Sequence, residues 1–115
     1  MHGSAKYLHL HYYLQYKLGQ AHRDYGDLEK GLFFFKEALM IERQTLGNDD
    51  PSVARTLNDI GNIHLQKNDV VPMMEAFVEA LRIYKRAGLS VNNLIVVGHK
   101  LYAFGIEYPE ASPAA

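Results

Sequence analysis

The chain repeats itself with a period of 42 residues, and this internal repeat constrains the fold more than any other feature. Eight positions of the first copy recur with the same or similar side chains in the second. They are Leu18, Gly19, His22, Asp27, Phe35, Ala38, Leu39 and Ile41, followed by Ile60, Gly61, His64, Asp69, Phe77, Ala80, Leu81 and Ile83. A partial third copy, shifted by 44 residues, is predicted at Leu101, Phe104, Gly105 and Tyr108. Such a period is typical of stacked units, which bury their apolar faces against their neighbours.

Each copy is predicted to form two helices joined by a short turn. Val53, Leu57 and Ile60 follow the 3.6-residue period that produces one apolar stripe along a helix. No stretch alternates with the period of two that a half-buried strand requires. The five predicted helices cover residues 5–25, 28–46, 51–67, 70–87 and 91–108.

The starts of three of these helices carry capping signals. Asp50 is the predicted N-cap of the third helix, and Pro51 lies in the first turn, where its missing N–H donor costs nothing. Asp27 and Asp69 hold the equivalent place before the second helix of each copy. These residues therefore indicate where the chain enters each helix.

The repeated residues also resemble a known family. A Leu-Gly pair, a ring-bearing residue, a phenylalanine and an Ala-Leu pair follow one another as Leu18–Gly19, His22, Phe35 and Ala38–Leu39. This order resembles the tetratricopeptide repeat (TPR), and the linker over residues 45–58 is similar to the longer repeats of kinesin light chains. The resemblance implies an all-α, TPR-like α-solenoid with two helix-turn-helix repeats and a C-terminal closing helix. We expect one such domain over residues 1–109 and a flexible tail over residues 110–115.

The predicted ligand site is a polar strip along the first helix of each copy. On the third helix the residues outside the apolar stripe form a second face, and the offsets of 42 and 44 transfer it to the other copies. The candidate peptide-binding residues are Tyr13, Tyr16, Gln20, Arg23, Arg55, Asn58, Asn62, Gln66, His99 and Tyr102. Amides can hold a peptide backbone, and arginines can bind an acidic group bidentately. The resemblance implies that the partner is an aromatic, acidic peptide on a concave face; the alternative is an ordinary solvated surface.

Composition excludes several other classes of function. With 12 Lys+Arg, 13 Asp+Glu and a net charge of −1, the chain lacks the basic cluster that nucleic acids or anionic membranes require. It has no cysteine, and no apolar run is long enough to span a membrane, so we expect a cytoplasmic protein. His9 and His11 point to different sides of a helix and cannot share a metal. No catalytic motif is present, so we expect no enzyme activity, cofactor or metal.

Two further expectations concern exposed apolar residues. Phe33, Phe34 and Phe35 span too much of a helix to face one interior, so we expect two in the core and one at the surface. The first helix carries apolar groups around nearly its whole circumference, at Tyr7, Leu8, Leu10, Tyr12, Tyr13 and Leu14. The alternative function is therefore a homo-oligomerising assembly module, or the C-terminal fragment of a longer TPR array.

Overall fold

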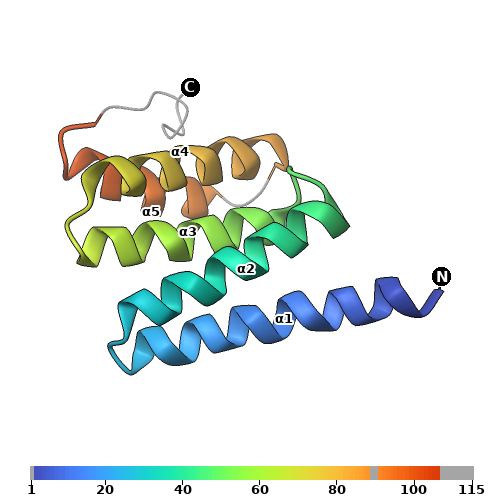
Figure 1. Ribbon diagram of the computed structural model, residues 1–115. Coiled ribbons are helices and arrows are strands. Elements are labelled where there is room, and N and C mark those ends of the chain that lie inside the picture. Colours follow the sequence, from blue (N-terminus) through green and yellow to red (C-terminus); the bar gives the residue numbers. More distant parts are fainter. Residues whose placement is uncertain (1, 89–90, 107–115) are drawn as a thin grey trace.

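The computed structural model describes residues 2–88 and 91–106 and shows five helices in that part of the chain (Figure 1). No strand occurs within these ranges. The helices are α1 (His2–Asp24), α2 (Leu28–Leu46), α3 (Pro51–Gln66), α4 (Val70–Arg86) and α5 (Val91–Tyr102). The all-helical fold and the order of its elements are confirmed.

Each helix packs against the next one along the chain, so α1–α2 and α3–α4 form two helix-turn-helix units and α5 closes the stack. Figure 1 shows α1 at one end of the stack and α4 with α5 at the other. The elongated extents of 45 × 32 × 19 Å fit this side-by-side arrangement. None of the described helices is both long enough and apolar enough to cross a membrane.

The same turn ends the first helix of each unit. Gly26, Asn68 and Gly105 all have left-handed backbone angles, with φ of 86°, 61° and 75°. The N–H of the residue after each of them donates to a carbonyl five residues back, at 2.9, 2.9 and 3.1 Å. This pattern is the Schellman motif, which satisfies carbonyls left free at a helix end. Asn68 can replace glycine there because asparagine tolerates the left-handed region better than most residues.

The turn at Gly105 corrects the predicted end and register of the third copy. The predicted helix over residues 91–108 stops at Tyr102, because Gly105 leaves the helical region of φ and ψ. Gly105 therefore matches Asn68, and Gly98 matches Gly61, both with an offset of 37 residues. The predicted offset of 44 was wrong by seven residues, or about two helical turns, which preserves the helix face. Tyr108 and the predicted tail over residues 110–115 lie outside the described residues.

The capping predictions are confirmed in part. The carboxylate of Asp50 accepts from the Ser52 N–H at 2.9 Å, and Asp27 accepts from the Lys30 N–H at 3.2 Å. Asp69 precedes α4 but makes no side-chain capping bond. The two copies thus begin their second helices in different ways.

A glycine on the first helix and a phenylalanine on the second lock each unit together. A Cβ atom at Gly19 would lie 2.6 Å from the Phe35 ring, and one at Gly61 would overlap the ring of Phe77. Both phenylalanines are fully buried. Only glycine leaves room for this approach, which explains why the repeat holds glycine at these two places.

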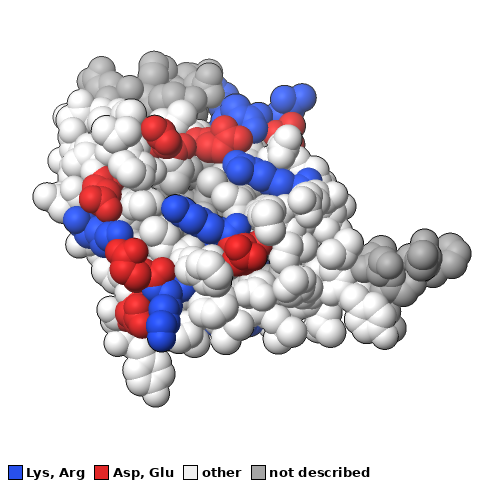
Figure 2. All heavy atoms as spheres, in the orientation of Figure 1, with Lys and Arg blue, Asp and Glu red and all other residues white. Residues whose placement is uncertain are grey.

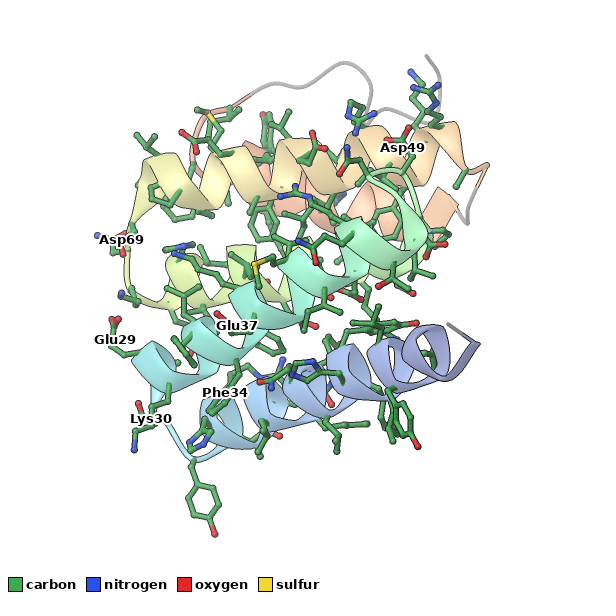
Figure 3. The ribbon with its side chains drawn as sticks, turned by 45° about the vertical axis from the view of Figure 1, so that its right-hand side comes forward. Glu29, Lys30, Phe34, Glu37, Asp49 and Asp69 are labelled. Carbon is green, nitrogen blue, oxygen red and sulfur yellow. The ribbon has the colours of Figure 1, made fainter. Side chains whose placement is uncertain are left out.

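The three consecutive phenylalanines separate as the helical period requires. Phe35 is buried, Phe33 is exposed, and Phe34 lies between them in exposure, on α2 beside α1 (Figure 3). The Phe34 ring stacks on the imidazole of His22, with centroids 5.2 Å apart. His22 therefore has a packing role, as does His64, which is buried.

Candidate ligand face

The first helices of the units present one continuous polar face, on which side chains from α1, α3 and α5 meet. Tyr16 and Arg23 of α1 reach Asp59 of α3, and Lys100 of α5 reaches Asn62 of α3. We call this surface the inner face and define it by Tyr16, Gln20, Arg23, Arg55, Asn58, Asp59, Asn62 and Lys100. Six of these eight residues were candidates from the sequence, so the predicted helix spacing brings most of them together.

Asp59 is the centre of the contacts between α1 and α3. Its carboxylate accepts from the Tyr16 hydroxyl at 2.5 Å and from the Arg23 guanidinium at 3.3 Å. Gln20 in turn donates to the Tyr16 hydroxyl at 3.3 Å. Burial raises the pKa of Asp59, while the hydrogen bond from Tyr16 and the nearby guanidinium groups oppose that rise. Burial and the bond to Asp59 raise the pKa of Tyr16 as well.

The position of Tyr16 corrects the expectation that its ring offers a flat exposed surface. Only 5% of Tyr16 is exposed, because this residue of α1 packs against α2 and α3. The Arg55 guanidinium covers the ring, with its central carbon 4.2 Å from the ring centroid. A guanidinium that stacks on a ring keeps its own N–H groups free to donate hydrogen bonds to a partner. Tyr16 therefore supports Arg55 instead of contacting a ligand itself.

Arg55 lacks a close counter-charge among the described residues. Its nearest carboxylate oxygen belongs to Glu42, 4.0 Å away. Glu42 is fully buried and accepts from the Thr56 hydroxyl at 2.6 Å. Burial raises the pKa of Glu42 to about 7, so near neutral pH it carries only part of a negative charge. A half-exposed arginine with an incomplete partner is suited to bind an external acidic group.

The two asparagines of α3 differ in what they contact. The carboxamide oxygen of Asn62 accepts from the Lys100 ammonium at 2.8 Å, whereas that of Asn58 is buried without a hydrogen-bond partner among the described residues. Burial lowers the pKa of Lys100, whose ammonium also lies 5.3 Å from the Phe77 ring centroid. The Gln15 carboxamide oxygen on α1 is likewise buried and without a partner, so this feature is not confined to the inner face.

The remaining sequence candidates lie outside this cluster. Tyr13 is exposed on α1, with the Lys17 ammonium 5.6 Å from its ring centroid. Gln66, His99 and Tyr102 are exposed and make no hydrogen bond to the inner face among the described residues. With the corrected offset of 37, His99 matches Asn62, so it extends the same helix face towards the end of the stack.

Sequence reasoning missed Asp59, Glu42 and Lys100. Asp59 could have been found, because it lies four residues after Arg55 and three before Asn62, within the same stripe. Lys100 matches no inner-face position of α3 under either offset, and it reaches Asn62 only because α5 packs in the folded stack. Glu42 comes from α2 and reaches this region only because α2 packs against α3.

Away from the inner face, a hollow of about 300 Å³ lies between α2 and α4. Lys36 and Arg43 line it from α2, while Glu75 and Glu79 line it from α4, above an apolar floor. The hydrogen bond from Arg82 lowers the pKa of Glu79, and the positive charge of Arg43 on the other wall acts in the same direction. Figure 2 likewise shows acidic and basic side chains interleaved, without a large area of one sign. Because side chains of both signs line this hollow, it is less suited than the inner face to bind a charged partner.

No group of acidic or histidine side chains in the described part of the chain could hold a metal ion. Comparison with known proteins identifies no relative, since no model of a protein family and no curated protein matches the chain.

Proposed function

We propose that the protein is a non-enzymatic scaffold of TPR-like helical repeats that binds a partner peptide or protein on the inner face. The repeated hairpins and their glycine–phenylalanine contacts support the resemblance to TPR proteins. The comparison with kinesin light chains rests on the sequence of the linker over residues 45–58 alone. A cytoplasmic location belongs to the same proposal, and a chain without cysteine has no disulfide to lose there.

The half-exposed Arg55, held over the Tyr16 ring without a close counter-charge among the described residues, is the observation that carries this proposal. Asn58 and Asn62 follow it along the same side of α3. Asparagine carboxamides can donate to and accept from the backbone of an extended peptide. The row therefore suits a peptide chain that runs along α3.

Charge favours an acidic partner. Arg23, Arg55 and Lys100 surround the single carboxylate of Asp59 on the inner face, and Lys100 has no carboxylate within ion-pair distance among the described residues. A partner carboxylate beside Arg55 would balance the positive charge of Arg55, which Glu42 balances only partly near neutral pH. We therefore expect peptides with acidic residues, and with an aromatic residue that contacts the exposed Tyr13 of α1 outside the inner face.

Titration with a peptide library, in which acidic and aromatic positions vary, tests the proposal. Selected peptides should bind Asn58→Ala/Asn62→Ala about 5- to 30-fold more weakly than the parent, the loss expected for truncated central contacts. Gln44→Ala/Asn48→Ala removes two amides from exposed positions elsewhere and should leave binding unchanged. Equal affinity of the parent and Asn58→Ala/Asn62→Ala would show that the peptide does not use this face.

The acidic preference has its own test. Arg55→Lys keeps the positive charge but loses the planar, bidentate group that lies over Tyr16. Peptides with acidic residues should lose affinity for this variant, while their amide counterparts should bind both proteins alike. An unchanged preference for acidic peptides would exclude Arg55 as the recognising group.

A further inference from the structure

One side of α1 carries an uncovered apolar stripe. Its residues follow one another at helical spacing, and we call them the end stripe: Tyr7, Leu10, Leu14 and Leu18 of α1, with Tyr25 directly after α1. Their exposed fractions range from 41% for Leu18 to 92% for Tyr25. Figure 1 shows α1 at the end of the stack, with other helices on one side of it only. The end stripe lies on the opposite side of α1 from the buried Tyr12 and Tyr16.

The equivalent residues of the second copy show what kind of contact such a stripe makes. Adding 42 to Leu14, Leu18 and Tyr25 gives Thr56 and Ile60 of α3 and Lys67, the residue directly after α3. All three meet α2: Thr56 donates to Glu42, Ile60 is buried in a cluster with Leu32 and Phe35, and Lys67 pairs with Glu29.

At α3 these positions therefore lie on the side that α2, the second helix of the preceding unit, covers. The same positions of α1 are more apolar, yet nothing in the described part of the chain covers them. The end stripe is thus suited to pack against a helix, and none of the described helices packs there.

We propose that a second copy of this chain covers the end stripe, with the two α1 helices packed antiparallel about a two-fold axis between Leu14 and Leu18. The stripe is apolar along its whole length, so two of them are complementary to each other. A head-to-tail contact would need a helix that plays the part of α2 after α5, and the described residues contain none. Closed two-fold pairs are also the commonest symmetry of protein assemblies.

Area and charge agree with a pair of copies. The exposed parts of the five side chains amount to roughly 500 Å² per copy, so two copies would bury about 1,000 Å², near the lower limit of a specific interface. Lys17 and Asp24, both exposed, border the stripe on one side. Because this border carries both signs, it does not repel an identical copy. The inner face uses other residues of α1, so this inference does not rest on the proposed function.

Sedimentation velocity on the full chain tests the pairing. We expect the parent to have twice the 13.1 kDa chain mass at micromolar concentration, and Leu14→Glu to shift dissociation by about tenfold or more towards the monomer. Met40→Glu changes a side chain of similar exposure on α2 and should remain paired. Circular dichroism should show that both variants keep their helices.

A parent chain that is monomeric up to millimolar concentration would overturn the proposal, and so would a Leu14→Glu variant that pairs as tightly as the parent. A mass that grows without limit would indicate a head-to-tail contact instead, which also contradicts it.

Cross-linking tests the antiparallel direction, since the chain has no cysteine of its own. Tyr7→Cys and Tyr25→Cys place a thiol at opposite ends of the end stripe. A mixture of the two variants should give a covalent pair with a short thiol cross-linker, whereas each variant alone should not. Efficient cross-linking of each variant with itself would show a parallel arrangement and overturn the proposed one.

Discussion

The units α1–α2 and α3–α4 share the contacts that hold each hairpin and differ where each hairpin meets its surroundings. Both use a glycine under a buried phenylalanine, and both end their first helix in the same turn. At the end of the second helix, however, α2 has the buried Glu42 and α4 has the buried Tyr84 at the equivalent position. Within a unit the repeat constrains the side chains, whereas between units each junction has its own chemistry.

The glycine–phenylalanine contact is where the two units should behave alike, and it carries the largest expected effect. Phe77→Ala should lower the free energy of unfolding by about 3–5 kcal/mol because it opens a cavity in the core, and Phe35→Ala should cost a similar amount. Chemical denaturation measures both. Phe33→Ala, at an exposed position, should change stability by less than about 0.5 kcal/mol. If Phe33→Ala proved the most damaging of the three, the assignment of helix faces would be wrong.

The junctions are where the units should differ, and pH separates them. The pKa of Glu42 rises from 4.5 to about 7 in the fold, so the folded state binds a proton more tightly than the unfolded state does. Stability from this group is full below about pH 4.5 and falls as the pH rises to about 7, by on the order of 2–3 kcal/mol.

Glu42→Gln should remove this dependence and make the protein more stable than the parent at pH 8, while the two should be alike at pH 4.5. Urea denaturation across this pH range checks the sign. A parent whose stability is flat between pH 4.5 and 7 would show that Glu42 is not held in a neutral form.

The starts of the second helices offer a smaller test of the same comparison. Asp27→Ala should cost about 1 kcal/mol, because the carboxylate caps the Lys30 N–H. Asp69→Ala should cost less than about 0.5 kcal/mol, since Asp69 makes no capping bond and its contacts with His64 and Lys67, at 3.6 and 3.7 Å, lie near the surface. Thermal melts rank the two, and Asp27→Ser should restore most of the loss. Figure 3 shows Asp69 in the turn before α4.

Helix order and most helix limits could be predicted because their signals are local. Apolar spacing, caps and turn residues lie within a few residues of the structure that they determine. The last helix was the exception, since its copy of the repeat keeps few matching side chains. The pair Gly98 and Gly105, 37 residues after Gly61 and Asn68, held the correct register but was not recognised.

The inner face was predicted only in outline. Helical spacing placed Arg55, Asn58 and Asn62 on one side of α3, and the structure agrees. Spacing alone did not show that Tyr16 is buried, because its burial depends on helices that follow it in the chain. It also did not show which charges meet.

The sequence by itself determined the repeat and the helices, since each is encoded by residues within one unit, whereas the glycine–phenylalanine contacts came from the structure. Only the tertiary structure decided which polar groups are satisfied, because the contacts of the inner face join residues 43, 36 and 38 positions apart. It likewise decided that α2 covers α3 while the end stripe of α1 stays uncovered. The physical reason is that helix formation depends on near neighbours, whereas burial and charge pairing depend on how separate helices pack.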